Sequence, residues 1–225
     1  QIQAKENKLE GLLLDIHPPA DLEHFAKLYE ALQSVIPFFV LDLSSEIDLE
    51  HLENAQLSTA PKSLIFTQKL DKTDAHYATQ LLQYCRDQQS IFALNAHPQD
   101  IEDAIGPILS KMGTENLILT TEAEESVQSI HPAGQYRALL ETAKIYFPNA
   151  PIWIRNTHAN SIARENYFSD RLLESSILSG NLLCDGIGDL ISIENEPNLE
   201  QAIPLAYNIL QGARARITKT EFVAC

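Results

Sequence analysis

The chain has 225 residues, of which 44% are hydrophobic and 21% are charged, proportions that are ordinary for a globular domain. Its 31 acidic residues outnumber its 16 basic residues and give a formal charge of −15, which opposes binding to nucleic-acid phosphates, anionic lipids or acidic proteins. No apolar run approaches the ~18 residues of a membrane-spanning helix, and the sequence does not start with a signal-peptide pattern.

Short apolar runs recur along the chain at intervals of roughly 25 to 35 residues, the size of one strand–helix unit. The runs are nearly continuous rather than alternating, as is typical of parallel strands buried on both faces. In chain order, the predicted strands are 12–16, 37–43, 63–66, 91–94, 117–119, 152–154 and 182–193.

The segments between these runs have the periodicity of amphipathic helices. Pro98 suits a first helical turn and Gly113 a C-terminal cap, whereas Pro107 between them predicts a kink or a break. Strands that alternate with helices predict a parallel sheet with right-handed crossovers.

The predicted fold class is α/β, with about seven parallel strand–helix units in a (β/α) barrel-like domain. This number comes close to a (β/α)₈ barrel, which takes ~250 residues. We favour an incomplete or slightly irregular barrel over an open, doubly wound sheet. The barrel-like domain is expected at 9–213, with 1–8 as a connector and 214–225 as a linker.

A barrel would hold any active site at the carboxyl ends of its strands. Polar residues at these ends are Asp15, His17, Asp42, Ser44, Thr67, Gln68, Asn95, His97, 120–122, 155–158, Asp185 and Asp189. Strand ends run into solvated loops, which are polar whether or not they are functional. The set is also mostly acidic, with Lys69 and Arg155 as its cations, whereas a phosphorylated substrate needs cations or a glycine-rich anion nest. We therefore predict no catalytic and no cofactor-binding residue here.

The seven histidines show no metal-binding spacing, and His17, His97 and His131 each precede a proline, as is typical of turns. The Gly-x-Gly stretch at 185–189 lacks the third glycine and the following helix of a dinucleotide-binding loop. It predicts a tight turn or a bulge between two strand segments.

The three cysteines are odd in number and widely spaced, which favours a reducing, cytoplasm-like compartment over a disulfide framework. Cys85 lies in a helical pattern and Cys184 in an apolar strand pattern, so both are predicted to be small buried hydrophobes. Cys225 follows an extended run. An iron–sulfur cluster needs several thiolates, so Cys225 cannot hold one alone.

Two segments carry a family resemblance: Leu-Leu-Cys-Asp-Gly-Ile-Gly-Asp at 182–189, and Asn-Ile-Leu-Gln-Gly-Ala-Arg at 208–214, which continues to Thr-Lys-Thr-Glu-Phe-Val-Ala-Cys at 218–225. In order and spacing they resemble the large, three-domain form of 4-hydroxy-3-methylbut-2-enyl diphosphate synthase. Thr121-Glu122-Ala123 resembles the motif around that family's catalytic glutamate. It lacks the following glycine and lies too far upstream of the Asp-Gly turn at 185–189. Glu122 is therefore not predicted to be catalytic.

The resemblance implies a parent enzyme that opens 2-C-methyl-D-erythritol 2,4-cyclodiphosphate reductively in isoprenoid biosynthesis. It would use a 4Fe-4S cluster fed by ferredoxin or flavodoxin, in the cytoplasm or, in a plant, the plastid stroma. The chain would be the insert between the substrate barrel and the cluster domain, its partners in the same protein. It would bind no cofactor itself, and Cys225 would be the first cluster ligand.

The leading hypothesis is therefore a non-catalytic spacer domain that sets the distance and angle between the two functional domains. A second is an independent barrel enzyme for a small neutral or cationic molecule, with His17, Asp42, Asn95 and Glu122 converging on a deep pocket. A third is a docking or dimerisation module, which would need a large exposed apolar patch.

Overall fold

Strands and helices alternate along the described part of the chain, as the periodicity predicts. The computed structural model describes residues 11–16, 19–43, 49–55, 57, 59–122, 131–158 and 167–215. The strands are β1 (Gly11–Ile16), β2 (Phe38–Leu43), β3 (Leu64–Leu70), β4 (Ile91–Ala96), β5 (Leu117–Thr120), β6 (Trp153–Asn156) and β7 (Leu190–Ile193).

Each strand is followed by one or more helical segments. The α-helices are α1 (Pro19–Leu32), α2 (Leu49–Ala55), α3 (Ala75–Asp87), α4 (Pro98–Asp100), α5 (Gly106–Leu109), α6 (Pro132–Tyr146), α7 (Phe168–Ser175), α8 (Asn181–Cys184) and α9 (Leu199–Gly212). Short 3-10 or π segments are η1 (Lys72–Asp74), η2 (Ile101–Ile105), η3 (Ser110–Met112) and η4 (Ser176–Gly180). None of the described helices is long and apolar enough to cross a membrane.

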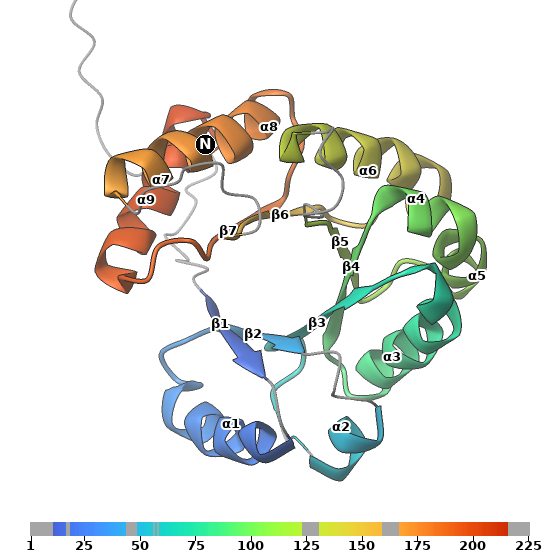
Figure 1. The fold of residues 1–225 in the computed structure, drawn as a ribbon. Helices are drawn as coiled ribbons and strands as arrows, with labels where there is room; N and C mark the ends of the chain where they lie inside the picture. The colour runs from blue at the N-terminus through green and yellow to red at the C-terminus, as the bar shows by residue number, and fades with distance from the viewer. Residues whose placement is uncertain are drawn as a thin grey trace, which may run out of the picture.

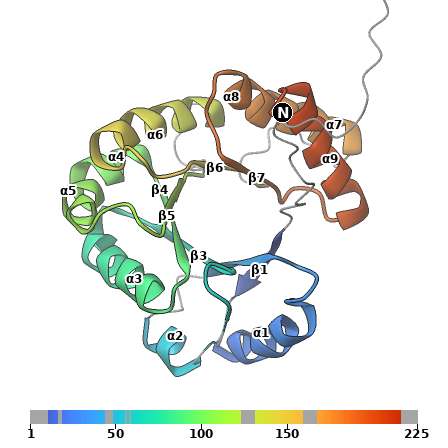
Figure 2. The same cartoon turned by 180° about the vertical axis from the view of Figure 1, so that it is seen from behind.

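The strands are parallel and follow one another in sequence order. β1 to β5 form a five-stranded sheet, and β6 and β7 form a two-stranded sheet. Among the described residues, a bridge between Leu119 and Ile152 joins the two. Figures 1 and 2 show the strands around a common centre with the helices outside them. The α/β class and the parallel arrangement are thus confirmed, whereas a complete seven-unit barrel stays a prediction because the described strands form two sheets.

Both faces of β2 to β6 are largely buried, which explains the nearly continuous apolar runs. Alternate side chains point to opposite faces of a strand. Val40, Ile65, Ala93 and Trp153, from β2, β3, β4 and β6, form one cluster on the inner face. The residues between them, such as Phe66 on β3, belong to the larger cluster under the helices. The alternation of side chains along each strand therefore determines which residues lie on the inner face and which lie under the helices.

The predicted strand 182–193 is wrong in its first half. Leu182 lies in α8 and is buried, and the strand itself is limited to Leu190–Ile193. The apolar residues before Asp185 continue the inward face of the preceding helical segments, where Leu178 is also buried. An apolar run of this length has no periodicity that separates a strand from a buried helix.

Cys184 is correspondingly not a buried strand residue. It ends α8 and is exposed, whereas Cys85 in α3 is buried as predicted. The glycine turn joins a helix to a strand rather than two strand segments. Gly186 and Gly188 have φ angles of 76° and 110°, which L-residues rarely adopt. The tight turn was thus predicted correctly, whereas the segment before it is a helix and not the predicted strand.

Candidate functional site

Arg155 is the centre of a buried ionic cluster at the carboxyl ends of the strands. It lies two residues after Trp153 on β6, so its side chain shares the inner face with that ring. Its guanidinium carbon is 4.8 Å from the centre of the Trp153 ring, a cation–π contact. The side chain is 3% exposed. A charge buried to this extent destabilises the fold unless it has partners of opposite charge.

Three carboxylates bind this guanidinium. Nη2 donates to Oδ2 of Asp42 on β2 and, at 2.6 Å, to Oε2 of Glu194 just after β7. Nε donates to Oε1 of Glu194 at 3.0 Å, so this pair is bidentate. Glu122, just after β5, has Oε1 3.4 Å from Nη1. Arg155 therefore ties β2 and β5 of the larger sheet to β6 and β7 of the smaller one.

Burial and charge act in opposite directions on these groups. Burial raises the pKa of Asp42 to about 6, and the attraction of Arg155 offsets only part of this rise. The nearby charges of Glu122 and Glu194 add to it. Burial alone would lower the pKa of Arg155. Its hydrogen bonds to Glu194 and the three negative charges outweigh burial, so the pKa lies above its ordinary value and the guanidinium stays charged.

The neutral residues on the inner face do not join this cluster. Thr67 on β3 and Asn95 on β4 follow Ile65 and Ala93 by two positions and are buried. Within the described residues, Oγ1 of Thr67 and Oδ1 of Asn95 have no hydrogen-bond partner. The strand ends thus carry an ion-pair cluster beside separate polar groups, and we find no nucleophile–base pair among them.

The remaining predicted site residues have structural roles or lie elsewhere. Asp185 pairs with Arg137 at 2.6 Å, and Asp189 accepts a hydrogen bond from the Ile152 amide at 2.9 Å. His97 caps α4 by accepting from the Gln99 amide, which agrees with turn chemistry. Asp15 and His158 are exposed, and Gln68 accepts a hydrogen bond from Tyr77. His17, Ser44 and Cys225 lie outside the described residues.

Sequence reasoning missed Glu194 as a member of the cluster. Leu190, Ser192 and Glu194 share one side of β7 and its extension, and the Ser192 hydroxyl donates to Glu194. The Trp153 indole donates to the same hydroxyl at 3.0 Å. The signal was available, because Glu194 is the first residue after the predicted strand and is acidic like the other strand ends.

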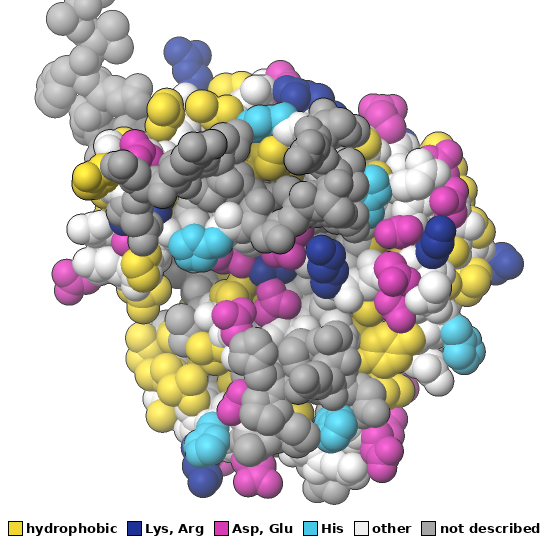
Figure 3. Space-filling model, in the orientation of Figure 1, with side chains coloured by type: hydrophobic (Ala, Val, Ile, Leu, Met, Phe, Trp, Pro, Cys, Tyr) yellow, Lys and Arg dark blue, Asp and Glu magenta, His cyan; other side chains and the backbone are white. Residues whose placement is uncertain are grey.

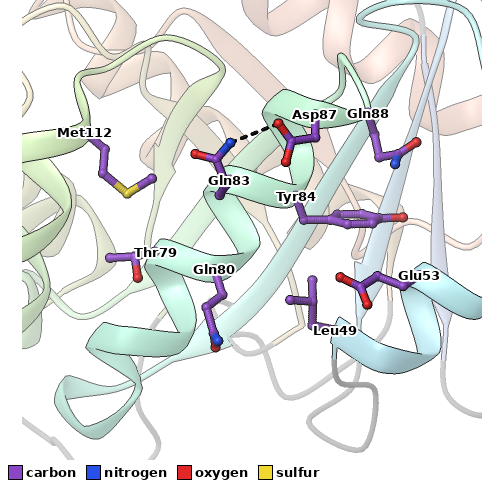
Figure 4. Close-up of a pocket in the computed structure, with 9 residues that line it drawn as sticks. All are labelled: Leu49, Glu53, Thr79, Gln80, Gln83, Tyr84, Asp87, Gln88 and Met112. Carbon is purple, nitrogen blue, oxygen red and sulfur yellow. Dashed lines mark hydrogen bonds between the residues drawn. The ribbon is translucent and has the colours of Figure 1, made fainter.

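A groove of about 520 Å³ lies away from the strand ends, across the outer side of α3. Figure 4 shows Leu49, Glu53 and Tyr84 on one side of α3 and Met112 on the other. Most of its lining is amide, hydroxyl or carboxylate, and Gln83 donates to Asp87 at 2.9 Å. It is lined by Leu49, Glu53, Thr79, Gln80, Gln83, Tyr84, Asp87, Gln88 and Met112. No residue of the Arg155 cluster lines this groove.

Curated proteins match the chain along almost its whole length. A 4-hydroxy-3-methylbut-2-en-1-yl diphosphate synthase (flavodoxin) of Leptospira interrogans is 27% identical over 223 residues, which cover 96% of this chain and 30% of the relative. The chain is a homologue of these synthases. The resemblance predicted from the sequence is thereby confirmed.

Shorter stretches of other synthases match more closely. The flavodoxin-type synthase of Chlorobaculum tepidum is 50% identical over 54 residues, which cover 24% of this chain and 7% of the relative. The ferredoxin-type, chloroplastic synthase of Oryza sativa is 32% identical over 103 residues, or 45% of this chain and 13% of the relative. No protein-family model matches the chain. The chain spans less than a third of the length of these curated relatives.

Proposed function

We propose that this chain is a non-catalytic spacer domain of a 4-hydroxy-3-methylbut-2-enyl diphosphate synthase. The observation that carries the proposal is the Arg155 cluster. A barrel enzyme would hold its substrate at the carboxyl ends of the strands. Here that place holds a buried arginine whose charge is already compensated by Asp42, Glu122 and Glu194.

Electrostatics support the proposal that the domain binds no diphosphate. The three carboxylates exceed the single guanidinium, and the exposed Asp15 lies beside Asp42 in the strand register. The whole chain carries a formal charge of −15. Figure 3 shows acidic side chains beside a few basic ones at the centre of the ring. A diphosphate would have to enter a negative field to reach the strand ends.

The chemistry of the whole synthase is assigned to its other domains. In this proposal they convert 2-C-methyl-D-erythritol 2,4-cyclodiphosphate to 4-hydroxy-3-methylbut-2-enyl diphosphate with electrons from flavodoxin or ferredoxin, the two words in the relatives' names. Within the described residues, no group of three His, Cys, Asp or Glu side chains could hold a metal ion. In this proposal the 4Fe-4S cluster belongs to the cluster domain, and Cys225 is its first ligand, as the family resemblance implies.

The contacts of Arg155 support the proposed spacer role. A domain that sets the distance between two others must resist bending, and in the described part of the chain one isolated bridge joins its two sheets. Arg155 adds ionic contacts from β6 to β2 and to the end of β5. These contacts stiffen the junction between the sheets.

No observation supports the alternative of an independent barrel enzyme. It predicts that Asp42, Asn95 and Glu122 line a deep pocket. Asp42 and Glu122 instead bind Arg155, and the groove described above lies on the outer side of α3.

Titration calorimetry of this chain with the cyclodiphosphate tests the proposal. We expect no binding heat at millimolar ligand, because the carboxyl ends of the strands are acidic and Arg155 is already paired with carboxylates. The whole synthase, titrated under the same conditions, is the positive control. Binding to this chain with a micromolar dissociation constant would refute the proposal.

A further inference from the structure

The inward side chains of the strands are arranged in layers, to which alternate strands contribute in a barrel. The apolar cluster on the inner face contains one residue from each of β2, β4 and β6: Val40, Ala93 and Trp153. Two residues further along the same strands are Asp42, Asn95 and Arg155, which therefore share the next layer. The ion pair between Arg155 and Asp42 shows that this layer extends from β6 to β2.

Thr67 on β3 lies between Asp42 and Asn95. It is the register partner of Asp42 in the adjacent strand. On its other side it pairs with Ala93, which precedes Asn95 by two residues. The strands β2, β3 and β4 are neighbours in the sheet (Figure 1). Because adjacent strands are ~4.8 Å apart, the three side chains border the same small region at the carboxyl end of β3.

Two of these side chains are buried and have an oxygen without a partner. Thr67 is 0% exposed and Asn95 is 2% exposed. Within the described residues, neither Oγ1 of Thr67 nor Oδ1 of Asn95 has a hydrogen-bond partner. Buried polar atoms in native proteins are almost always paired, so an exception indicates a water molecule, an ion or a ligand beside it. Two such oxygens on adjacent strands indicate one shared occupant.

The charge around these oxygens favours a cation as the occupant. With the exposed Asp15, the inner face of the described strand ends carries four carboxylates against two cationic groups, Arg155 and Lys69. Lys69 follows Thr67 by two residues and is exposed. Burial raises the pKa of Asp42 to about 6, and Arg155 offsets only part of this rise. A water molecule would pair the two orphan oxygens but would leave the negative charge uncompensated.

We propose that Asp42, Thr67 and Asn95 bind a monovalent cation of the size of K⁺ or ammonium. Oδ2 of Asp42 accepts from Arg155, so Oδ1 is assigned to the cation, together with Oγ1 of Thr67 and Oδ1 of Asn95. Carbonyl oxygens replace the hydration shell of K⁺ in other proteins. One carboxylate and two neutral oxygens match a single positive charge, whereas Arg155 and Lys69 repel a divalent ion more strongly.

This site goes beyond the proposed spacer role and involves no chemical step. Arg155 connects Asp42 on β2 to β6 and to the ends of β5 and β7. The cation connects the same Asp42 to β3 and β4, the two strands that the ionic cluster does not reach. Both connections meet at Asp42, so the strand ends are held together by a guanidinium on one side and by an inorganic cation on the other.

Hydrogen–deuterium exchange of the whole synthase, read by mass spectrometry, tests the proposal. Exchange in potassium chloride is compared with exchange in tetramethylammonium chloride, whose cation is too large for the site. A bound ion slows every opening that breaks its site by one plus the ratio of its concentration to its dissociation constant. With about 100 mM K⁺ and a dissociation constant of about 10 mM, amides of β3 and β4 should exchange about tenfold more slowly. Amides of α9 are the internal reference.

Two threonines give a matched pair of variants. Thr67→Val removes a proposed ligand and should abolish the effect of K⁺. Thr121→Val is the control, because Thr121 is also buried with an unpartnered Oγ1 but lies outside the proposed site, so the effect of K⁺ should persist. Lys69→Met removes a nearby positive charge and should give the same protection at a lower K⁺ concentration.

Three results would overturn the proposal. They are equal exchange in the two salts, an effect of K⁺ that survives in Thr67→Val, and protection by Mg²⁺ but not by K⁺. Product formation by the same synthase is measured separately, so a failure of the cation site and a failure of the proposed function are distinguishable.

Discussion

Arg155 is the residue on which the proposed function of this domain depends most. Its position at the end of β6 is where an enzyme of this architecture would place a substrate-binding cation. In this chain, carboxylates from three other strand ends compensate its charge. The same residue that could recognise a phosphate is thereby converted into a structural cross-link.

Removal of this guanidinium should be costly. Arg155→Met leaves Asp42, Glu122 and Glu194 close together without a counter-charge, and loss of one partner of a buried ion pair costs about 3–5 kcal/mol. The free energy of unfolding in urea measures this cost. Arg137→Met is the matched control, because its pair with Asp185 is half exposed and should be worth under about 1 kcal/mol. Equal stability of the two variants would contradict the central role of Arg155.

Asp42 should make the stability depend on pH. Its pKa in the folded chain, about 6, is above the ordinary 3.8, so folding favours the protonated form. The resulting stabilisation is complete below pH 3.8 and is lost as the pH rises through 6. This group alone should make the chain less stable at pH 7.5 than at pH 3.8 by about 3 kcal/mol.

Asp42→Asn removes this titration and keeps an oxygen that accepts from Arg155. Urea unfolding of both proteins from pH 4 to 7.5 measures the difference. We expect the pH dependence of the variant to be flatter by nearly that amount. Parallel curves for the two proteins would show that Asp42 titrates normally in the fold.

At the scale of elements, most strands were predictable because burial on both faces produces an unmistakable apolar run. β2 and β4 lie within two residues of the predicted 37–43 and 91–94. The start of β7 was not, because α8 is a short helix whose apolar residues merge with the strand pattern. The ends of the strands supplied Asp42, Glu122 and Arg155 as candidates. That they bind one another depends on side-chain reach across the ring, which no local pattern encodes.

The turn between α8 and β7 is sensitive to the addition of a single methyl group. Gly188 has a φ angle of 110°, and a Cβ there would lie 2.4 Å from Cδ1 of Ile154. Gly188→Ala should therefore destabilise the chain by roughly 1–3 kcal/mol, even if Ile154 shifts. Gly212→Ala is the control, since nothing lies within 4 Å of its Cβ position and helical alanine is favourable. Thermal unfolding of both variants measures the difference, and equal midpoints would contradict the assigned strain.

At the scale of the whole molecule, the composition correctly indicated a globular domain. It did not identify the function of the chain. The charge of −15 argued against anionic ligands, and the alternation of runs predicted a parallel α/β fold. The exposed apolar side chains of α7 could not be predicted, because exposure depends on which side of the helix packs inward. Ser175 and Ser179 are buried beside Leu178, whereas Leu173 and Ile177 are exposed.

The central claim is that this domain supports catalysis without taking part in it. The most direct test is kcat of the whole synthase carrying Glu122→Gln, the position that resembles the family's catalytic motif. Glu122 contacts Arg155 at 3.4 Å, and Asp42 and Glu194 remain to hold the guanidinium, so the fold should persist. We expect kcat within about twofold of the unsubstituted enzyme, whereas loss of a catalytic acid–base group costs roughly 10²–10⁴-fold. A hundredfold loss with an intact fold would contradict the account.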